Sequence, residues 1–222
     1  TINEDKSNEM SMFPVQSSLA MHLAEKALAG CVPVVVLNEQ DQYYLSLIKN
    51  ILVAKGKMNV IWETLVFSTG PNGIDAAAET FAAGADLPVV LLTADEQGEK
   101  VRARLLARGY KDDQQKVMSL TDFVPGATTF EDIIPANFVE IFSRLYLAEL
   151  LGNDFQYDKT QNLLQQIEEY AAEHEIELPF NYRSELAKRM KLNTMRFYRD
   201  VRLPRRYVLD WINIWHTLLA RS

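Results

Sequence analysis

The sequence contains few of the residues that build disulfides or zinc centres. Cys31 is the only cysteine among 222 residues, which excludes an internal disulfide and a zinc site made of several thiolates. His22, His174 and His216 lie far apart in the chain and show no ligand spacing. We therefore expect structural or surface roles for the histidines, and a reducing, cytoplasmic environment for the protein.

Long apolar runs and the common nucleotide and hydrolase motifs are also missing. No apolar run approaches the ~18 residues that a membrane-spanning helix needs, and no basic-then-apolar leader is visible, so we expect no membrane partner. The stretch "STGPNG" (68–73) fits neither GxGxxG nor GxxxxGK[ST], so no nucleotide site is expected in this chain. A GxSxG elbow is absent too. Because the sequence begins at Thr1, we expect a processed product or a piece of a longer protein.

The charge of the chain is unevenly distributed. The composition, 48% hydrophobic and 24% charged, is that of an ordinary globular protein with a net charge of −7. Residues 183–222 nevertheless carry ten Lys and Arg against three acids. A basic tail on an acidic body can contact nucleic acid phosphates, or it can fold back on the body.

Apolar runs alternate with helical patterns over the first 135 residues. Strands are predicted at 33–37, within 60–67, at 87–92 and at 116–120; helices are predicted at 17–28, from Asp41 onward, after "STGPNG" to about residue 83, and at 96–108. The fully apolar, β-branched run "PVVVL" is typical of a strand covered on both faces. We therefore predict a doubly wound, mainly parallel α/β sheet with sites at the carboxyl ends of its strands.

Beyond Pro135 the strand pattern ends and only helical patterns follow. They cover residues 137–151, 158–173, 183–191 and 205–219. We therefore divide the chain into a flexible lead-in or linker (1–14), an α/β domain (15–135) and a C-terminal helical region (136–222).

Acidic residues gather where the predicted strands end. Glu39 and Asp41 follow the first strand, Asp95 follows the third, and Glu131 and Asp132 lie beyond the fourth. Clustered carboxylates at such a rim are natural ligands for Mg²⁺ or Mn²⁺, and a pair of these ions can cleave phosphodiesters. Acids also stabilise helix N-termini, and Asp41, Asp132 and Glu96, which follows Asp95, are each placed to do so.

The order of four segments resembles the Toprim domain of OLD-family (overcoming lysogenization defect) ATP-dependent endonucleases, over residues 15–150. The segments are "VVVLNEQDQYYL" (34–45), "VFSTGPNGI" (66–74), "VVLLTADEQGEKV" (89–101) and "ATTFEDIIP" (127–135). The resemblance implies a Toprim-like fold, a metal-dependent DNA endonuclease using Mg²⁺ or Mn²⁺, and a homo-oligomer. It also implies an ABC-type ATPase partner, in the same full-length chain or in another subunit, and a role in DNA repair or phage defence.

Through this resemblance Asp41, Asp95 and Glu131 are the expected metal ligands, and Asp132 and Glu39 are further catalytic candidates. The sequence departs from the family pattern at ligand positions. Leu37 stands where the family has a metal-binding Glu, Asn38 replaces a Gly, and Thr93 replaces the first acid of Asp-x-Asp. We therefore expect an impaired nuclease site that holds one ion. The alternative is a catalytically inactive module for assembly or nucleic-acid binding.

The basic tail supplies the candidates for nucleic-acid contact. They are Arg183, which stands where the family has a lysine, and Lys188, Arg189, Arg199, Arg205 and Arg206. Tyr198, Tyr207, Trp211 and Trp215 are interleaved with these residues and suit base stacking, but helical spacing of the apolar residues favours a packing face. A third interpretation is an unrelated α/β regulatory domain with a closed ligand pocket at the strand ends.

Overall fold

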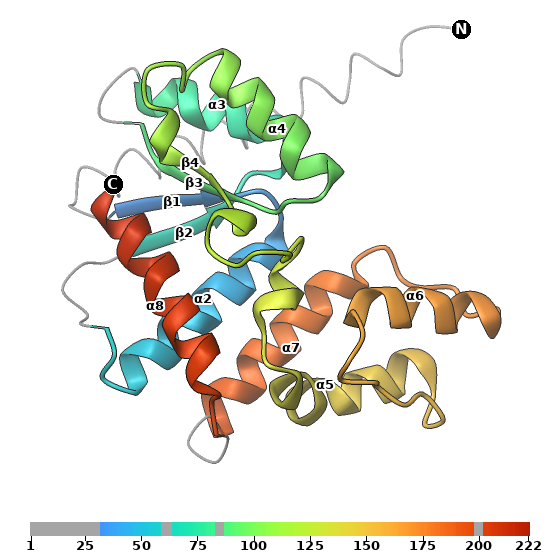
Figure 1. The fold of residues 1–222 in the computed structure, drawn as a ribbon. Helices are drawn as coiled ribbons and strands as arrows, with labels where there is room; N and C mark the ends of the chain where they lie inside the picture. Colours follow the sequence, from blue (N-terminus) through green and yellow to red (C-terminus); the bar gives the residue numbers. More distant parts are fainter. Residues whose placement is uncertain (1–31, 59–63, 83–86, 198–201) are drawn as a thin grey trace, which may run out of the picture.

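The computed structural model describes residues 32–58, 64–82, 87–197 and 202–222 (Figure 1). At its centre lies a sheet of β1 (Val32–Val36), β2 (Thr64–Ser68), β3 (Val89–Leu92) and β4 (Val117–Ser119), in the order β2-β1-β3-β4. Every pairing in this sheet is parallel. The predicted α/β class, with a parallel sheet and helices after it, is confirmed.

Helices follow the strands and then continue alone after β4. They are α2 (Glu39–Ala54), α3 (Gly70–Ala82), α4 (Glu96–Ala107), α5 (Ala136–Leu151), α6 (Leu163–Glu173), α7 (Tyr182–Phe197) and α8 (Arg205–Ala220). Three short 3-10 turns, η1 (Gln114–Lys116), η2 (Leu120–Asp122) and η3 (Phe130–Ile133), flank β4 and precede α5. In the described part of the chain, no helix has both the length and the apolar character needed to cross a membrane.

The two faces of the sheet bury separate sets of side chains. Val34 and Val36 of β1 belong to the larger core, which includes residues of α2, α5, α7 and α8, while Val35 and Leu37 belong to a smaller core with α3 and α4. This alternation follows from the two-residue period of a strand. Figure 1 shows the result, with α3 and α4 on one side of the sheet and α2 and α8 on the other.

The sheet reverses its winding direction between β1 and β3. The chain moves outward from β1 through α2 to β2, and then returns through α3 to β3, on the opposite side of β1. In sheets of this type the crevice outside the carboxyl ends of the two strands at the reversal point is where ligands bind. The residues that follow β1 and β3 therefore meet at the most favourable edge for a site.

Two glycines near this edge are required, Gly98 by a close approach and Gly70 by its left-handed backbone conformation. A Cβ on Gly98 would lie 2.0 Å from the carbonyl oxygen of Thr93, so only glycine lets α4 start against the end of β3. Gly70 has a φ of 68°, and its N–H donates to the carbonyl of Leu37 at 2.9 Å. The segment 68–73 is thus no simple break, since α3 already begins at Gly70.

Other helix boundaries differ slightly from the sequence prediction. The helix predicted from residue 158 begins at Leu163, because the Asn162 side chain accepts the N–H of Gln165 and caps it there. Asp158 instead accepts the N–H and hydroxyl of Thr160 in the preceding turn. The helix predicted at 17–28 and the lead-in at 1–14 lie outside the described residues.

Candidate functional site

Asp41 is a fully buried acid at the start of α2. Its Oδ2 accepts the backbone N–H of Asn38 at 2.9 Å, so it stabilises the helix start, although the N-cap residue itself is Asn38. Its Oδ1 has no hydrogen-bond partner. Burial raises the pKa of Asp41 from 3.8 to about 7, with further increases from the charges of Glu131 and Asp95. The Asn38 N–H and the Arg183 guanidinium oppose this shift.

Glu131 is the second buried acid, and it lies in η3. Its Oε2 lies 3.5 Å from Nη2 of Arg183, and its side chain is 1% exposed. Its Oε1 makes no hydrogen bond of acceptable geometry. Burial raises the pKa of Glu131, while Arg183, the Glu131 backbone amide and the nearby Thr129 hydroxyl act to lower it.

Asp132 follows Glu131 in the chain but serves a different purpose. Its Oδ2 accepts the backbone N–H groups of Thr128 and Thr129, each at 2.9 Å, and so stabilises the start of η3. Its Oδ1 accepts the Asn162 side-chain amide at 2.6 Å. The interpretation of Asp132 as a helix-stabilising acid is therefore confirmed, and its carboxylate already has several donors.

The loop after β3 brings Thr93 and Asp95 to the same edge. Asp95 is the N-cap of α4, and its Oδ1 accepts both the Gly98 N–H at 2.8 Å and the Thr93 hydroxyl at 2.9 Å. Thr93 is 1% exposed. Glu96 lies exposed in the first turn of α4, where the sequence predicted a helix-stabilising acid, and it also pairs with Lys100.

Glu39 and Leu37, which flank Asn38 after β1, point in different directions: the first is exposed and the second is buried. Glu39 is exposed and accepts the Tyr43 hydroxyl at 2.9 Å, four residues along α2. Leu37 stands where the resemblance to the OLD family predicts a metal-binding Glu, and it is completely buried in the smaller core. The acid that reaches the interior from this loop is therefore Asp41.

Arg183 enters the site from α7, far along the sequence. Helix α7 packs along α2, and the Ser184 hydroxyl donates to the Gln40 side chain at 3.3 Å near the starts of the two helices. The positive ends of both helix dipoles thus lie near the buried acids. The sequence assigned Arg183 to nucleic-acid contact, and the structure pairs it with Glu131. Its correspondence to a lysine of the OLD family was the one sequence signal that Arg183 belongs to a site.

Asp41, Asp95 and Glu131 form what we call the acidic cluster. Asp41 interacts electrostatically with both other acids and with Arg183. In the residues that the structure describes, however, no three or more His, Cys, Asp or Glu side chains are arranged to hold a metal ion together. Within the cluster Arg183 interacts with Asp41 and Glu131, and the Asp95 carboxylate already accepts two hydrogen bonds.

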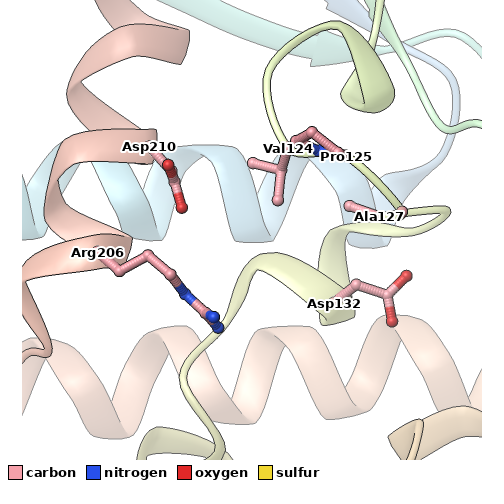
Figure 2. Close-up of a pocket in the computed structure, with 7 residues that line it drawn as sticks. Val124, Pro125, Ala127, Asp132, Arg206 and Asp210 are labelled. Atoms are coloured by element: carbon pink, nitrogen blue, oxygen red, sulfur yellow. The ribbon is translucent and has the colours of Figure 1, made fainter.

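A pocket of about 450 Å³ lies next to η3 (Figure 2). It is lined by Asp132, by Arg206 and Asp210 of α8, and by residues 124–127 of the preceding loop. The Arg206 guanidinium carbon lies 4.9 Å from the ring centre of Tyr207, and its Nη2 donates to the Tyr207 hydroxyl. Arg206 thus lines this pocket, which contains no member of the acidic cluster among its lining residues.

The other candidate nucleic-acid contacts are spread over two helices. Lys188 and Arg189 are exposed on α7 and interact with Glu185 at 2.9 and 3.9 Å. Arg205 is exposed in the first turn of α8. Arg199 lies outside the described residues.

The tryptophans of the tail belong to the core. Trp211 and Trp215 are both completely buried, and the Trp211 indole N–H donates to the Ile133 carbonyl at 2.9 Å. The interpretation of these residues as a packing face is therefore confirmed, and Tyr198 lies outside the described residues.

Comparisons of the chain with protein-family models, with curated proteins and with solved structures find no match.

Proposed function

We propose that the chain is the Toprim-like module of an OLD-type ATP-dependent endonuclease that acts on DNA, with a weakened site for one divalent cation. The observation that carries this proposal is a pair of buried carboxyl oxygens, Oδ1 of Asp41 and Oε1 of Glu131, that have no hydrogen-bond partner. They belong to residues that interact at the reversal point of the sheet. A buried polar atom without a partner calls for an explanation such as an ordered water or an ion, and here two such carboxyl oxygens belong to interacting acids.

Oxygen donors of this kind suit Mg²⁺ or Mn²⁺. Asp41 and Glu131 would hold the ion, and Asp95 would add negative charge from the end of β3. A bound ion would supply Lewis-acid polarisation of a phosphate oxygen. A second ion has no such support, because Leu37 is apolar and the neutral Thr93 hydroxyl already donates to Asp95. Cleavage by two metals is therefore not part of the proposal.

Exposed cations supply the surface for DNA in this proposal. Lys188, Arg189, Arg205 and Arg206 are all exposed, and phosphate contacts by such residues give sequence-independent, salt-dependent binding. The ATPase would be supplied by another part of the full-length protein or by a partner subunit.

The experiment is titration calorimetry of Mn²⁺ into the metal-free chain, into Asp41→Asn and into Glu131→Gln. We expect one ion per chain, and we expect both variants to lose binding. Asp122→Asn is the matched control, because the Asp122 carboxylate accepts the Ser119 N–H at 2.8 Å in the way that Asp41 accepts Asn38, yet it is exposed. Absence of binding by the unmodified chain at millimolar Mn²⁺ would refute the cation site.

A second candidate is a non-hydrolytic Toprim-like module that binds nucleic acid or assembles with a partner. It is favoured by the presence of a guanidinium, that of Arg183, among the buried acids. Assays of the chain on plasmid and single-stranded DNA with Mn²⁺ separate the two candidates. Cleavage that Asp41→Asn abolishes would support the first, whereas salt-dependent DNA binding without cleavage would support the second. In the second case Leu37→Glu with Thr93→Asp tests whether carboxylates alone restore cleavage.

A further inference from the structure

The ion pair joins a buried acid, Glu131, to a half-buried Arg183, and its geometry is poor. A good arginine–carboxylate pair places two N–H groups on two oxygens at about 2.8 Å, but here Nη2 and Oε2 lie 3.5 Å apart. The Arg183 Nε has no hydrogen-bond partner, and neither do Oε1 of Glu131 and Oδ1 of Asp41. The guanidinium thus supplies charge to the acids but only one long hydrogen bond, from Nη2 to Oε2 of Glu131.

The charge itself is needed at this position. Asp41 and Glu131 are buried, Asp95 adds a third carboxyl group nearby, and Arg183 interacts electrostatically with Asp41 as well as with Glu131. A buried carboxylate without a counter-charge is strongly unfavourable. An arginine cannot lose its proton in a protein, so its charge leaves the cluster only if the side chain moves.

We infer that the Arg183 guanidinium takes the place of a divalent cation in the acidic cluster, so that Arg183 and the ion exclude each other. This inference rests on the proposed function only for the identity of the ion. It makes Arg183 a regulator of the site: an ion enters when Arg183 leaves Glu131. By reciprocity, an ion at Glu131 weakens the Arg183 ion pair to the same degree that Arg183 weakens ion binding.

The test compares Mn²⁺ binding to the unmodified chain, to Arg183→Gln and to Arg183→Lys by calorimetry. Arg183→Gln removes the positive charge, and we expect it to bind one Mn²⁺ at least about tenfold more tightly, because like charges repel strongly at a desolvated site. Arg183→Lys keeps the charge, and we expect binding as weak as in the unmodified chain. Arg189→Gln is the matched control, since Arg189 is an exposed arginine on the same helix, and we expect no change.

Equal or weaker binding by Arg183→Gln would overturn the inference, and so would an Arg183→Lys chain that behaves like Arg183→Gln. If Arg183→Gln does not fold in EDTA, circular dichroism in Mn²⁺ replaces calorimetry: refolding by Mn²⁺ supports the inference and failure to refold overturns it. The proposed function fails separately. If only Arg183→Gln binds Mn²⁺, the native cation site is refuted while the role of Arg183 stands. If the unmodified chain and Arg183→Gln bind Mn²⁺ equally, the native cation site stands and the role of Arg183 is refuted.

Discussion

Replacing Asp41 by Asn should stabilise the protein, and the gain should grow with pH. Burial holds the pKa of Asp41 at about 7 in the folded chain, against an ordinary value of 3.8. Because the pKa is raised in the folded state, the contribution of protonated Asp41 to the free energy of unfolding is fully present below the ordinary pKa of the group. It is lost as pH rises through about 7. At ~1.4 kcal/mol per pKa unit, the loss above neutral pH is about 4 kcal/mol.

Asn cannot ionise, and its side-chain oxygen can still accept the Asn38 N–H. We therefore expect the free energy of unfolding of Asp41→Asn to exceed that of the unmodified chain by about 4 kcal/mol near pH ~8, and by much less near pH ~5. Urea unfolding in EDTA across this range, followed by the fluorescence of the buried Trp211 and Trp215, measures the difference.

Asp122→Asn is the control for this comparison, because its carboxylate makes the same type of backbone hydrogen bond while exposed to water. It should not reproduce the pH-dependent gain. If the free energies of unfolding of Asp41→Asn and the unmodified chain differ by the same amount at every pH, burial of Asp41 does not control its ionisation, and the reasoning is refuted.

Two further predictions concern stability. Gly98→Ala should lower the free energy of unfolding by about 1–3 kcal/mol through overpacking, because the new Cβ meets backbone at 2.0 Å. Exposed Gly109 has open space around it, so the control Gly109→Ala should change the free energy of unfolding by less than ~0.5 kcal/mol. Equal urea midpoints for the two variants would contradict the prediction. Trp211→Phe should cost ~1–3 kcal/mol more than Trp215→Phe, since only Trp211 has an indole N–H bond, to the Ile133 carbonyl. Equal losses in thermal or urea unfolding would show that this hydrogen bond contributes nothing.

The parallel sheet could be predicted from the sequence because its signal is local. Fully apolar runs rich in valine, such as 34–36 and 89–92, show that both faces of a strand are covered, and the structure buries both. That Asp41 and Asp95 follow the first and third strands could also be read from the sequence. Which strand lies beside which does not follow from local pattern, and the reversal between β1 and β3 became visible only in the structure.

The direction of each acidic side chain could not be predicted. Glu39 and Asp41 are two residues apart, yet one lies on the exposed side of α2 and the other in the core, since side-chain direction on a helix turns by about 100° per residue. The partner of Glu131 is 52 residues away in α7. Such a pairing depends on how α7 packs on α2, which no short motif encodes.

The larger core has a consequence for the order in which the protein can fold during synthesis. Trp211 closes this core against Ile133, 78 residues earlier, and Arg221 reaches the Gln115 carbonyl across 106 residues. The part of this core that Trp211 and its neighbours on α8 fill therefore stays uncovered on the ribosome until α8 has been made. Long-range closure of this kind is slow and leaves intermediates prone to aggregation. We expect a nascent chain stalled before residue 205 to bind general chaperones, and release from them should coincide with the docking of α8 on α2.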